Sequence, residues 1–275
     1  MKALISADME GVTGVTASDD CQPGRRSHPR FQPLFTGDVN AVALGLFDAG
    51  VDEVVVTEGH NNMRHVLLEN LDPRITMISG NVKTFAMLEG IQDGPDLVAF
   101  VGYHSAAGTE GVLSHTFLGS ELTGATLNGR IMSEGYLNAL LTAEYGARLA
   151  VVSGDDVTCR DAADYAPAST QVTVKTAVDR YTARCLAPEV TAQLLREAAA
   201  SSVTTAEVPP LPPPPYRCEL TFTVSNCAAA AALVPCVERT ADRTVRFEFD
   251  TVGALYRCFS VVCAMAGGAS EPGYG

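Results

Sequence analysis

The chain has 275 residues, of which 47% are apolar and 19% are charged, a composition typical of a globular protein and not of a disordered one. Its length allows one large domain, or one domain with a smaller companion. The net charge of −13 disfavours nucleic acid and anionic membrane surfaces as partners.

The N-terminus and the cysteines indicate a cytoplasmic protein. A strand begins directly after Lys2, which leaves no room for a signal peptide. No apolar stretch approaches the roughly 18 residues that a membrane helix needs. The eight cysteines contain no C-x-x-C pair, so we expect reduced thiols and not a disulfide framework.

The first element in chain order is a short apolar run at residues 3–7, which ends at Asp8 and is followed by Glu10. This pattern predicts a buried strand that ends in two carboxylates. A desolvated carboxylate is costly without a partner, so either a cation or basic side chains must meet these two. Helix capping or pairing with arginine is the simpler alternative.

Strands and helices then alternate along the chain. After a loop at 17–34, we expect a helix at 39–49 capped by Thr36, a strand at 53–57, a short helix at 65–70, a strand at 75–79, a helix at 83–90, a strand at 97–101, a hairpin at 125–132, a helix at 134–145, a strand at 149–152, a helix at 160–165, a strand at 172–177 and a helix at 188–200. The continuous apolar strands predict an α/β fold, with a mainly parallel sheet covered by helices on both faces.

The last quarter of the chain has a different pattern. Residues 209–215, PPLPPPP, predict a stiff extended connector. Strands at 219–224 and 244–249, a helix at 252–266 and a loose tail from Gly267 follow. We therefore expect a catalytic α/β domain at 1–200, a connector at 201–216 and a smaller C-terminal α+β segment at 217–275.

Potential metal ligands follow three of the predicted strands. Asp8 and Glu10 follow the first, His60 the second and His104 the strand at 97–101, while Glu134 begins a helix. In open α/β sheets the carboxyl ends of the strands form the site. Carboxylates and imidazoles suit zinc or manganese, and five ligands suit two metals about 3.5–4 Å apart. Alone, each histidine would be read as structural and Glu134 as a first-turn helix acid.

Other polar residues leave alternatives open. His115 lies in a glycine-rich loop and is either a general acid or base or a hydrogen-bonded loop histidine. His28 and His65 are expected to be solvated. Asp155 and Asp156 either orient a ligand histidine or, as we favour, cap the next helix.

Several blocks of the sequence resemble the DppA-type D-aminopeptidases, a family of bacterial zinc peptidases. The matching blocks lie mainly between residue 1 and about 190 and are Ser6-Ala7-Asp8-Met9-Glu10-Gly11-Val12-Thr13-Gly14, Ile78-Ser79-Gly80-Asn81-Val82-Lys83, Gly102-Tyr103-His104, Gly111-Val112-Leu113-Ser114-His115-Thr116, Glu134 with Leu137-Asn138-Ala139, Gly154-Asp155-Asp156, Lys175-Thr176-Ala177 and Cys185-Leu186-Ala187-Pro188. The first and the Gly-Tyr-His blocks are the most specific.

The resemblance implies an aminopeptidase that hydrolyses short peptides beginning with a D-residue, D-alanine in particular, through a water activated by two zinc ions. The implied ligands are Asp8, which would bridge the two metals, with Glu10, His60, His104 and Glu134. His115 would be the catalytic histidine. The resemblance also implies a homo-oligomer, a ring-like decamer with the sites facing an inner channel.

The sequence departs from the family pattern near the second strand. Glu58-Gly59-His60 stands where the family usually has Asp-Ser-His, and Asn81 stands where an Asp is common. Glu58 is therefore a candidate partner for the substrate's α-amino group. These departures leave open an alternative function, a two-metal amide hydrolase or amide-forming enzyme acting on a non-peptide or biosynthetic substrate.

Overall fold

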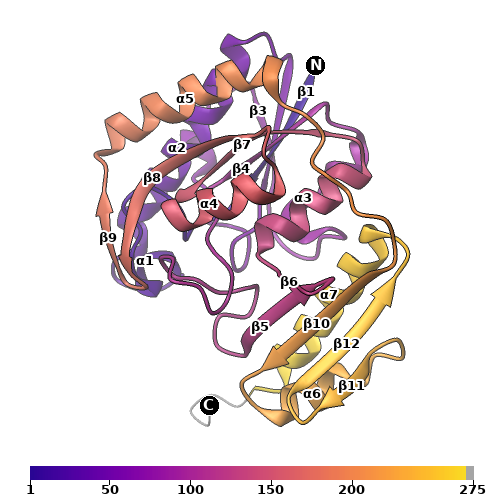
Figure 1. Ribbon diagram of the computed structural model, residues 1–275. Coiled ribbons are helices and arrows are strands. Elements are labelled where there is room, and N and C mark those ends of the chain that lie inside the picture. Colours follow the sequence, from indigo (N-terminus) through magenta and orange to yellow (C-terminus); the bar gives the residue numbers. More distant parts are fainter. Residues whose placement is uncertain (271–275) are drawn as a thin grey trace.

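The computed structural model describes residues 1–270, and within them the strands form two sheets (Figure 1). The larger sheet has the order β3-β2-β1-β4-β7-β8-β9. Its strands are β1 (Lys2–Ala7), β2 (Glu53–Glu58), β3 (Ile75–Ile78), β4 (Leu97–Val101), β7 (Arg148–Asp155), β8 (Thr170–Asp179) and β9 (Thr182–Cys185). All neighbours pair in parallel except β8 and β9, which confirms the predicted mainly parallel sheet.

Helices cover both faces of this sheet. The helices are α1 (Ser18–Cys21), α2 (His28–Asp48), α3 (Glu134–Glu144), α4 (Asp156–Tyr165), α5 (Pro188–Thr205), α6 (Ser225–Ala231) and α7 (Val252–Gly268). One apolar core joins the sheet to α2 and α5, and a second core joins it to α3 and α4. Successive residues of β1 alternate between them, since Ala3 and Ile5 lie in the first core and Leu4 in the second. Both faces of the sheet are therefore buried, as the continuous apolar strands predicted.

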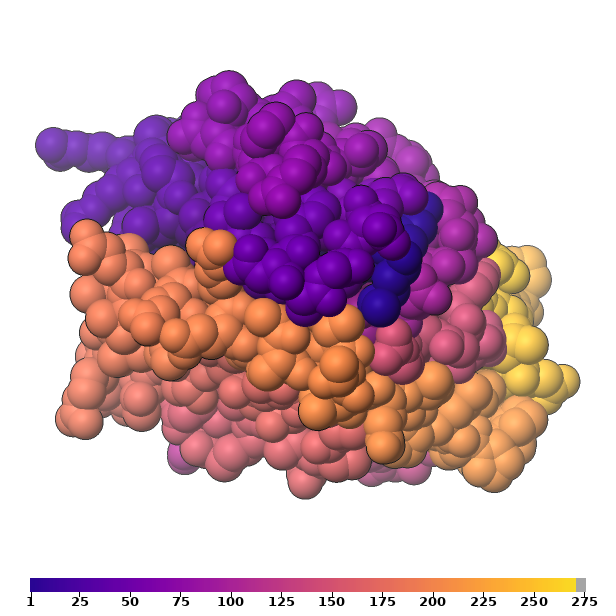
Figure 2. All heavy atoms as spheres, turned by 90° about the horizontal axis from the view of Figure 1, so that it is seen from above, coloured from indigo at the N-terminus to yellow at the C-terminus, as the bar shows by residue number. Residues whose placement is uncertain are grey.

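Helices α2 and α5 pack closely over one face. Figure 2 shows α5, in orange, against the indigo N-terminal part of the chain. A glycine at position 45 permits this approach, because a Cβ there would lie 2.1 Å from the backbone oxygen of Arg196 in α5. The two helices thereby form one continuous layer over this face of the sheet.

Helix α2 begins eleven residues before the predicted start at Val39, at His28. The segment was expected to be a loop because of Pro29 and Pro33. Pro29 lies in the first turn, where a missing N–H costs nothing, and Pro33 removes one helical hydrogen bond. Burial of Phe31 and Phe35, one turn apart on the helix, offsets that loss.

The second sheet is antiparallel and has the order β11-β12-β10-β5-β6. Its strands are β5 (Leu122–Leu127), β6 (Arg130–Ile131), β10 (Tyr216–Phe222), β11 (Glu238–Ala241) and β12 (Thr244–Phe249). The predicted hairpin at 125–132 thus pairs with strands of the C-terminal segment, through β5 and β10. Residues 208–215 are neither helix nor strand, in agreement with an extended connector. The division into two domains stays a prediction.

Smaller elements differ from the predictions. The helices expected at 65–70 and 83–90 are only single 3-10 turns, η1 (Leu68–Asn70) and η2 (Ala86–Leu88), and a third turn is η3 (Ile91–Asp93). The sequence patterns did not predict α1, α6, β9 or β11. Helix α7 extends to Gly268, and residues 271–275 of the expected loose tail lie outside the described residues. None of the helices in the described chain combines the length and apolar character needed to span a membrane.

Candidate metal centre

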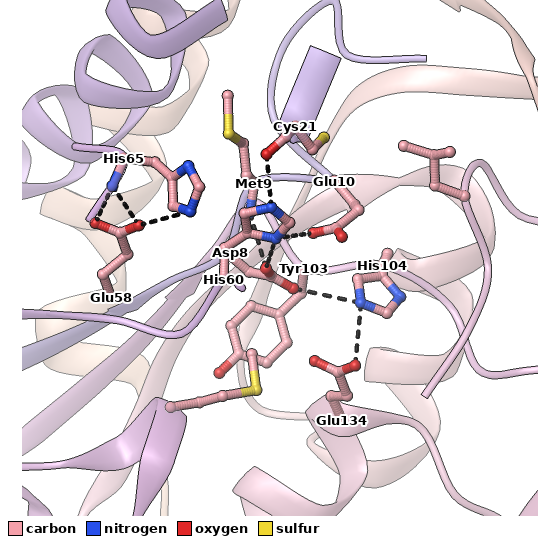
Figure 3. Close-up of polar contacts among 12 residues, drawn as sticks. Asp8, Met9, Glu10, Cys21, Glu58, His60, His65, Tyr103, His104 and Glu134 are labelled. Atoms are coloured by element: carbon pink, nitrogen blue, oxygen red, sulfur yellow. Dashed lines mark hydrogen bonds and ion pairs between the residues drawn. The ribbon is translucent and has the colours of Figure 1, made fainter. Parts of the chain in front are cut away.

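The predicted ligands converge at one edge of the larger sheet. Strand β1 pairs in parallel with both β2 and β4, so the carboxyl ends of the three strands lie side by side. Asp8 and Glu10 follow β1, His60 follows β2, and His104 follows β4. Glu134 is the first residue of α3 and points at the same centre, as Figure 3 shows.

A close contact between two loops fixes this arrangement. The N–H of Gly11, after β1, donates to the backbone oxygen of Gly102, after β4, over 2.7 Å. A Cβ at position 11 would lie 1.8 Å from the backbone oxygen of Tyr103, so only glycine fits there. The loop that carries Glu10 is therefore held against the loop that carries His104.

His60 faces two carboxylates. Its Nδ1 lies 2.8 Å from Glu10 Oε2 and 3.4 Å from Asp8 Oδ1. Its Nε2 lies 3.0 Å from the backbone oxygen of Cys21, an acceptor, so Nε2 carries the hydrogen. In the neutral ring the lone pair is then on Nδ1 and is directed at the carboxylates, which is the arrangement of a metal-ligating histidine.

His104 repeats this arrangement on the other side of Asp8. Its Nε2 lies 3.4 Å from Asp8 Oδ2 and 3.3 Å from Glu134 Oε1. Its Nδ1 donates to the backbone oxygen of Ser105 over 3.0 Å, which leaves the lone pair of the neutral ring on Nε2. Glu134 Oε1 also accepts from the N–H of Phe117, over 2.7 Å.

The donor set fits two cations. Asp8, Glu10 and His60 form one cluster of ligand atoms, and Asp8, His104 and Glu134 form another, each within 4.8 Å. Asp8 belongs to both. In the neutral tautomers just described, the imidazole nitrogens nearest to Asp8 Oδ2 and Glu10 Oε2 carry lone pairs, so these two buried oxygens accept no hydrogen bond within the described chain. Unpaired buried carboxylate oxygens are costly, and a cation between them would remove the cost.

The electrostatics of the centre favour replacement of protons by a cation. Burial, together with the neighbouring Glu10, raises the pKa of Asp8 to about 7. Burial lowers the pKa of His104, but the charges of Glu134 and Asp8 outweigh it and raise the pKa to about 10. The pKa of His60 is raised well above its usual value because Glu10 and Asp8 outweigh burial. The carboxylates thus hold protons on this centre that a bound cation would displace.

His115 lies beside the ligands. It belongs to neither cluster that contains Asp8, but its ligand atom lies within 4.8 Å of those of Glu10 and His104. Its ring stacks on His104, with centroids 4.0 Å apart. Nδ1 donates to the backbone oxygen of Leu113 over 2.7 Å, and Nε2 lies 3.7 Å from Glu10 Oε1. Burial, and then the charge of His104, lower the pKa of His115. A neutral imidazole with a free Nε2 therefore faces the centre.

All five candidate ligands and His115 line one cavity of about 570 Å³. This volume is in the range of small-molecule binding sites. The residues predicted from the strand ends thus share one cavity with the histidine from the glycine-rich loop.

Two predictions for neighbouring residues are wrong. His28 and His65 are buried, and His28 Nε2 lies 2.9 Å from His65 Nδ1. Glu58 is fully buried, and its carboxylate accepts hydrogen bonds from the N–H groups of His65 and Val66. Glu58 does not line the cavity and turns away from His60 toward His65 (Figure 3). It cannot bind the substrate's amino group.

Asp155 caps α4, as favoured from the sequence, because its Oδ1 accepts from the N–H of Thr158 over 2.8 Å. Its Oδ2 also accepts from the N–H of Val112, over 2.6 Å. The cap therefore anchors the loop that carries His115.

Lys175 supports the centre, and the sequence patterns did not indicate this role. Its Nζ donates to the backbone oxygens of Glu10, Val12 and Val15, over 2.6, 2.9 and 2.6 Å. The side chain is buried at 1% exposure. The surrounding strand, TQVTVKTAVD, mixes polar and apolar residues, so nothing local distinguishes this lysine from a solvated one. A buried ammonium needs acceptors, and the three backbone oxygens supply them.

Comparison with known proteins agrees with this geometry. A family model described as D-aminopeptidase matches residues 1–261. A D-aminopeptidase of Bacillus subtilis (strain 168) is 32% identical over 270 residues, which cover 97% of this chain and 98% of that protein. The solved structure of the Zn-dependent D-aminopeptidase DppA from Bacillus subtilis, described as a self-compartmentalizing protease, superposes with a TM-score of 0.94 at 30% identity. That match covers 98% of this chain and 100% of the other.

Proposed function

This chain belongs to the D-aminopeptidase family of metallopeptidases, and from that premise we propose that it uses two zinc ions to hydrolyse short peptides with an N-terminal D-residue, of the D-alanine type. The observation that supports the proposal most strongly is the position of Asp8 between two ligand clusters. A carboxylate shared in this way suits a pair of metals and not a single ion.

The ligands divide between the two metals. Asp8, Glu10 and His60 would hold one zinc ion, and Asp8, His104 and Glu134 would hold the other. Zinc supplies Lewis acidity, which lowers the pKa of a water and polarises the scissile carbonyl. The hydrogen bonds from His60 to Cys21 and from His104 to Ser105 keep both rings in the ligating tautomer.

His115 is the catalytic residue in this proposal. Its free Nε2 faces the centre, and the Leu113 carbonyl fixes the ring through Nδ1. Once protonated, Nε2 can transfer a proton to the leaving amine or stabilise negative charge on the carbonyl oxygen. The lowered pKa keeps His115 able to release that proton near neutral pH.

The assembly is part of the proposal. The solved relative is described as self-compartmentalizing, and we extend this property to the present chain as a homo-oligomer, a decameric ring. A closed ring would restrict access to small, unfolded substrates, which agrees with short peptides as the substrate class.

The test is hydrolysis of D-Ala-D-Ala and L-Ala-L-Ala by the zinc-loaded wild type and by Asp8→Asn. We expect cleavage of the D-peptide only, its loss on chelation with recovery on adding zinc, and no cleavage by the variant. Bound zinc without cleavage of either peptide would instead favour an amide substrate that is not a peptide. Equal cleavage of both peptides would refute the D-selectivity.

A further inference from the structure

The charges around the cavity are strongly unequal. Carboxylates of Asp8, Glu10, Glu121 and Glu134 line it, whereas Arg180 is the one lysine or arginine among the lining residues of the described chain. A short unblocked peptide carries an ammonium at one end and a carboxylate at the other. The acidic side chains can attract the ammonium, but the peptide carboxylate needs a cationic partner.

Arg180 is held next to the catalytic loop. It lies in the tight turn between β8 and β9, and its backbone oxygen accepts from the N–H of Leu113 over 2.8 Å. Leu113 is the residue whose own carbonyl fixes the ring of His115. One backbone hydrogen bond therefore links the turn that carries Arg180 to the loop that carries His115.

The guanidinium of Arg180 is available to a ligand. Within residues 1–270 it makes no ion pair and no side-chain hydrogen bond; its only side-chain partner is the ring of Tyr181, at 5.7 Å. Tyr181 lines the cavity as well. Asp179, the nearest acid in sequence, accepts instead from the backbone N–H of Arg180. This loose cation–π contact leaves the N–H groups of the guanidinium free for a carboxylate.

We propose that Arg180 binds the C-terminal carboxylate of the peptide and so selects short, unblocked substrates. The inference rests on the proposed aminopeptidase function. A dipeptide carries its ammonium on the residue before the scissile amide and its carboxylate on the residue after it. With the ammonium near the acidic side chains of the cavity, the carboxylate can be met by Arg180. A planar guanidinium can meet the carboxylate with two parallel hydrogen bonds, which lysine cannot do.

The experiment compares two substrates that differ only at this end, D-Ala-D-Ala and its C-terminal amide. KM and kcat are measured for zinc-loaded wild type, Arg180→Ala and Arg180→Lys, with Arg184→Ala as the matched control. Arg184 is an exposed arginine on the adjoining β9 and does not line the cavity. Zinc content and the oligomer mass of each variant are measured alongside.

We expect Arg180→Ala to raise KM for the free dipeptide roughly tenfold or more, the loss of a charge-assisted hydrogen bond, and to leave KM for the amide unchanged. Arg180→Lys should fall in between, and Arg184→Ala should behave as wild type. An equal change for both substrates, or none, would overturn the role of Arg180. Failure of the wild type to cleave either substrate would count against the proposed function instead.

Discussion

At the scale of single residues, His115 differs from the ligand histidines because it belongs to neither cluster that contains Asp8, and because its pKa is lowered by burial and by the charge of His104, whereas the pKa values of His60 and His104 are raised. We expect His115→Gln to lower kcat roughly 10²- to 10⁴-fold, the usual effect of removing a general acid or base. Zinc content and thermal stability should stay near wild type. Loss of zinc in this variant would instead make His115 a ligand.

Asp38 gives the chain a pH-dependent stability. The residue is buried, and its carboxylate accepts hydrogen bonds from the N–H and Oγ1 of Thr13. Burial raises its pKa to about 6, from 3.8. Because the folded state favours the protonated form, the stabilisation present below pH 3.8 is lost as the pH rises through 6.

Asp38→Asn removes this titration and should therefore gain stability relative to wild type between pH 4 and 7, on the order of 2 kcal/mol. Urea unfolding of both proteins at several pH values measures this difference in stability. Any effect of metal release on stability is the same in both proteins and cancels in the difference. A difference that does not change with pH would show that Asp38 has an ordinary pKa.

The location of a single residue could be predicted when its position at the end of a strand determines where its side chain lies. Asp8, His60 and His104 each follow a buried parallel strand, so one rule placed all three at one edge. His28 and His65 could not be placed in this way. They are buried because two segments 37 residues apart meet, and nothing local in the sequence shows that contact.

At the scale of elements, Lys175 on β8 joins the loop after β1 to the sheet. Lys175→Met would leave three backbone oxygens without their donor. We expect a loss of about 3 kcal/mol in unfolding free energy and weaker zinc binding, because Glu10 lies in that loop. Chemical unfolding and zinc titration measure the two effects.

Lys2→Met is the matched control for this prediction. Lys2 forms a half-exposed ion pair with Glu53, and such pairs contribute at most about 1 kcal/mol. If both variants lost the same stability, the contacts of Lys175 with the loop would not be structural supports.

A strand can be predicted when its own sequence is a continuous apolar run. It cannot be predicted when it forms only by pairing with a strand that is distant in the sequence. The parallel strands of the larger sheet follow from their own sequences, whereas the antiparallel edge strand β9 does not. Pairing of β5 with β10 does not follow either, because it joins Leu127 to Cys218, which are separated in the chain by residues 128–217. The predicted helix at 39–49 is shorter than α2 because the prolines are visible in the sequence, whereas the burial of Phe31 depends on tertiary packing.

At the scale of the whole molecule, the proposed decamer predicts a mass in solution about ten times the 28.9 kDa of one chain. Light scattering coupled to size exclusion measures this directly. A monomeric or dimeric mass for active, zinc-loaded protein would contradict the proposed ring and leave the metal centre unaffected.

The measurement that tests the central claim most directly is the zinc content per chain of wild type, Glu134→Gln and Asp8→Asn, purified without chelator. Two clusters that share Asp8 predict about two zinc ions in wild type, about one in Glu134→Gln and less than one in Asp8→Asn. A wild type that holds one zinc ion or none, or an Asp8→Asn variant that keeps both, would contradict the two-zinc centre.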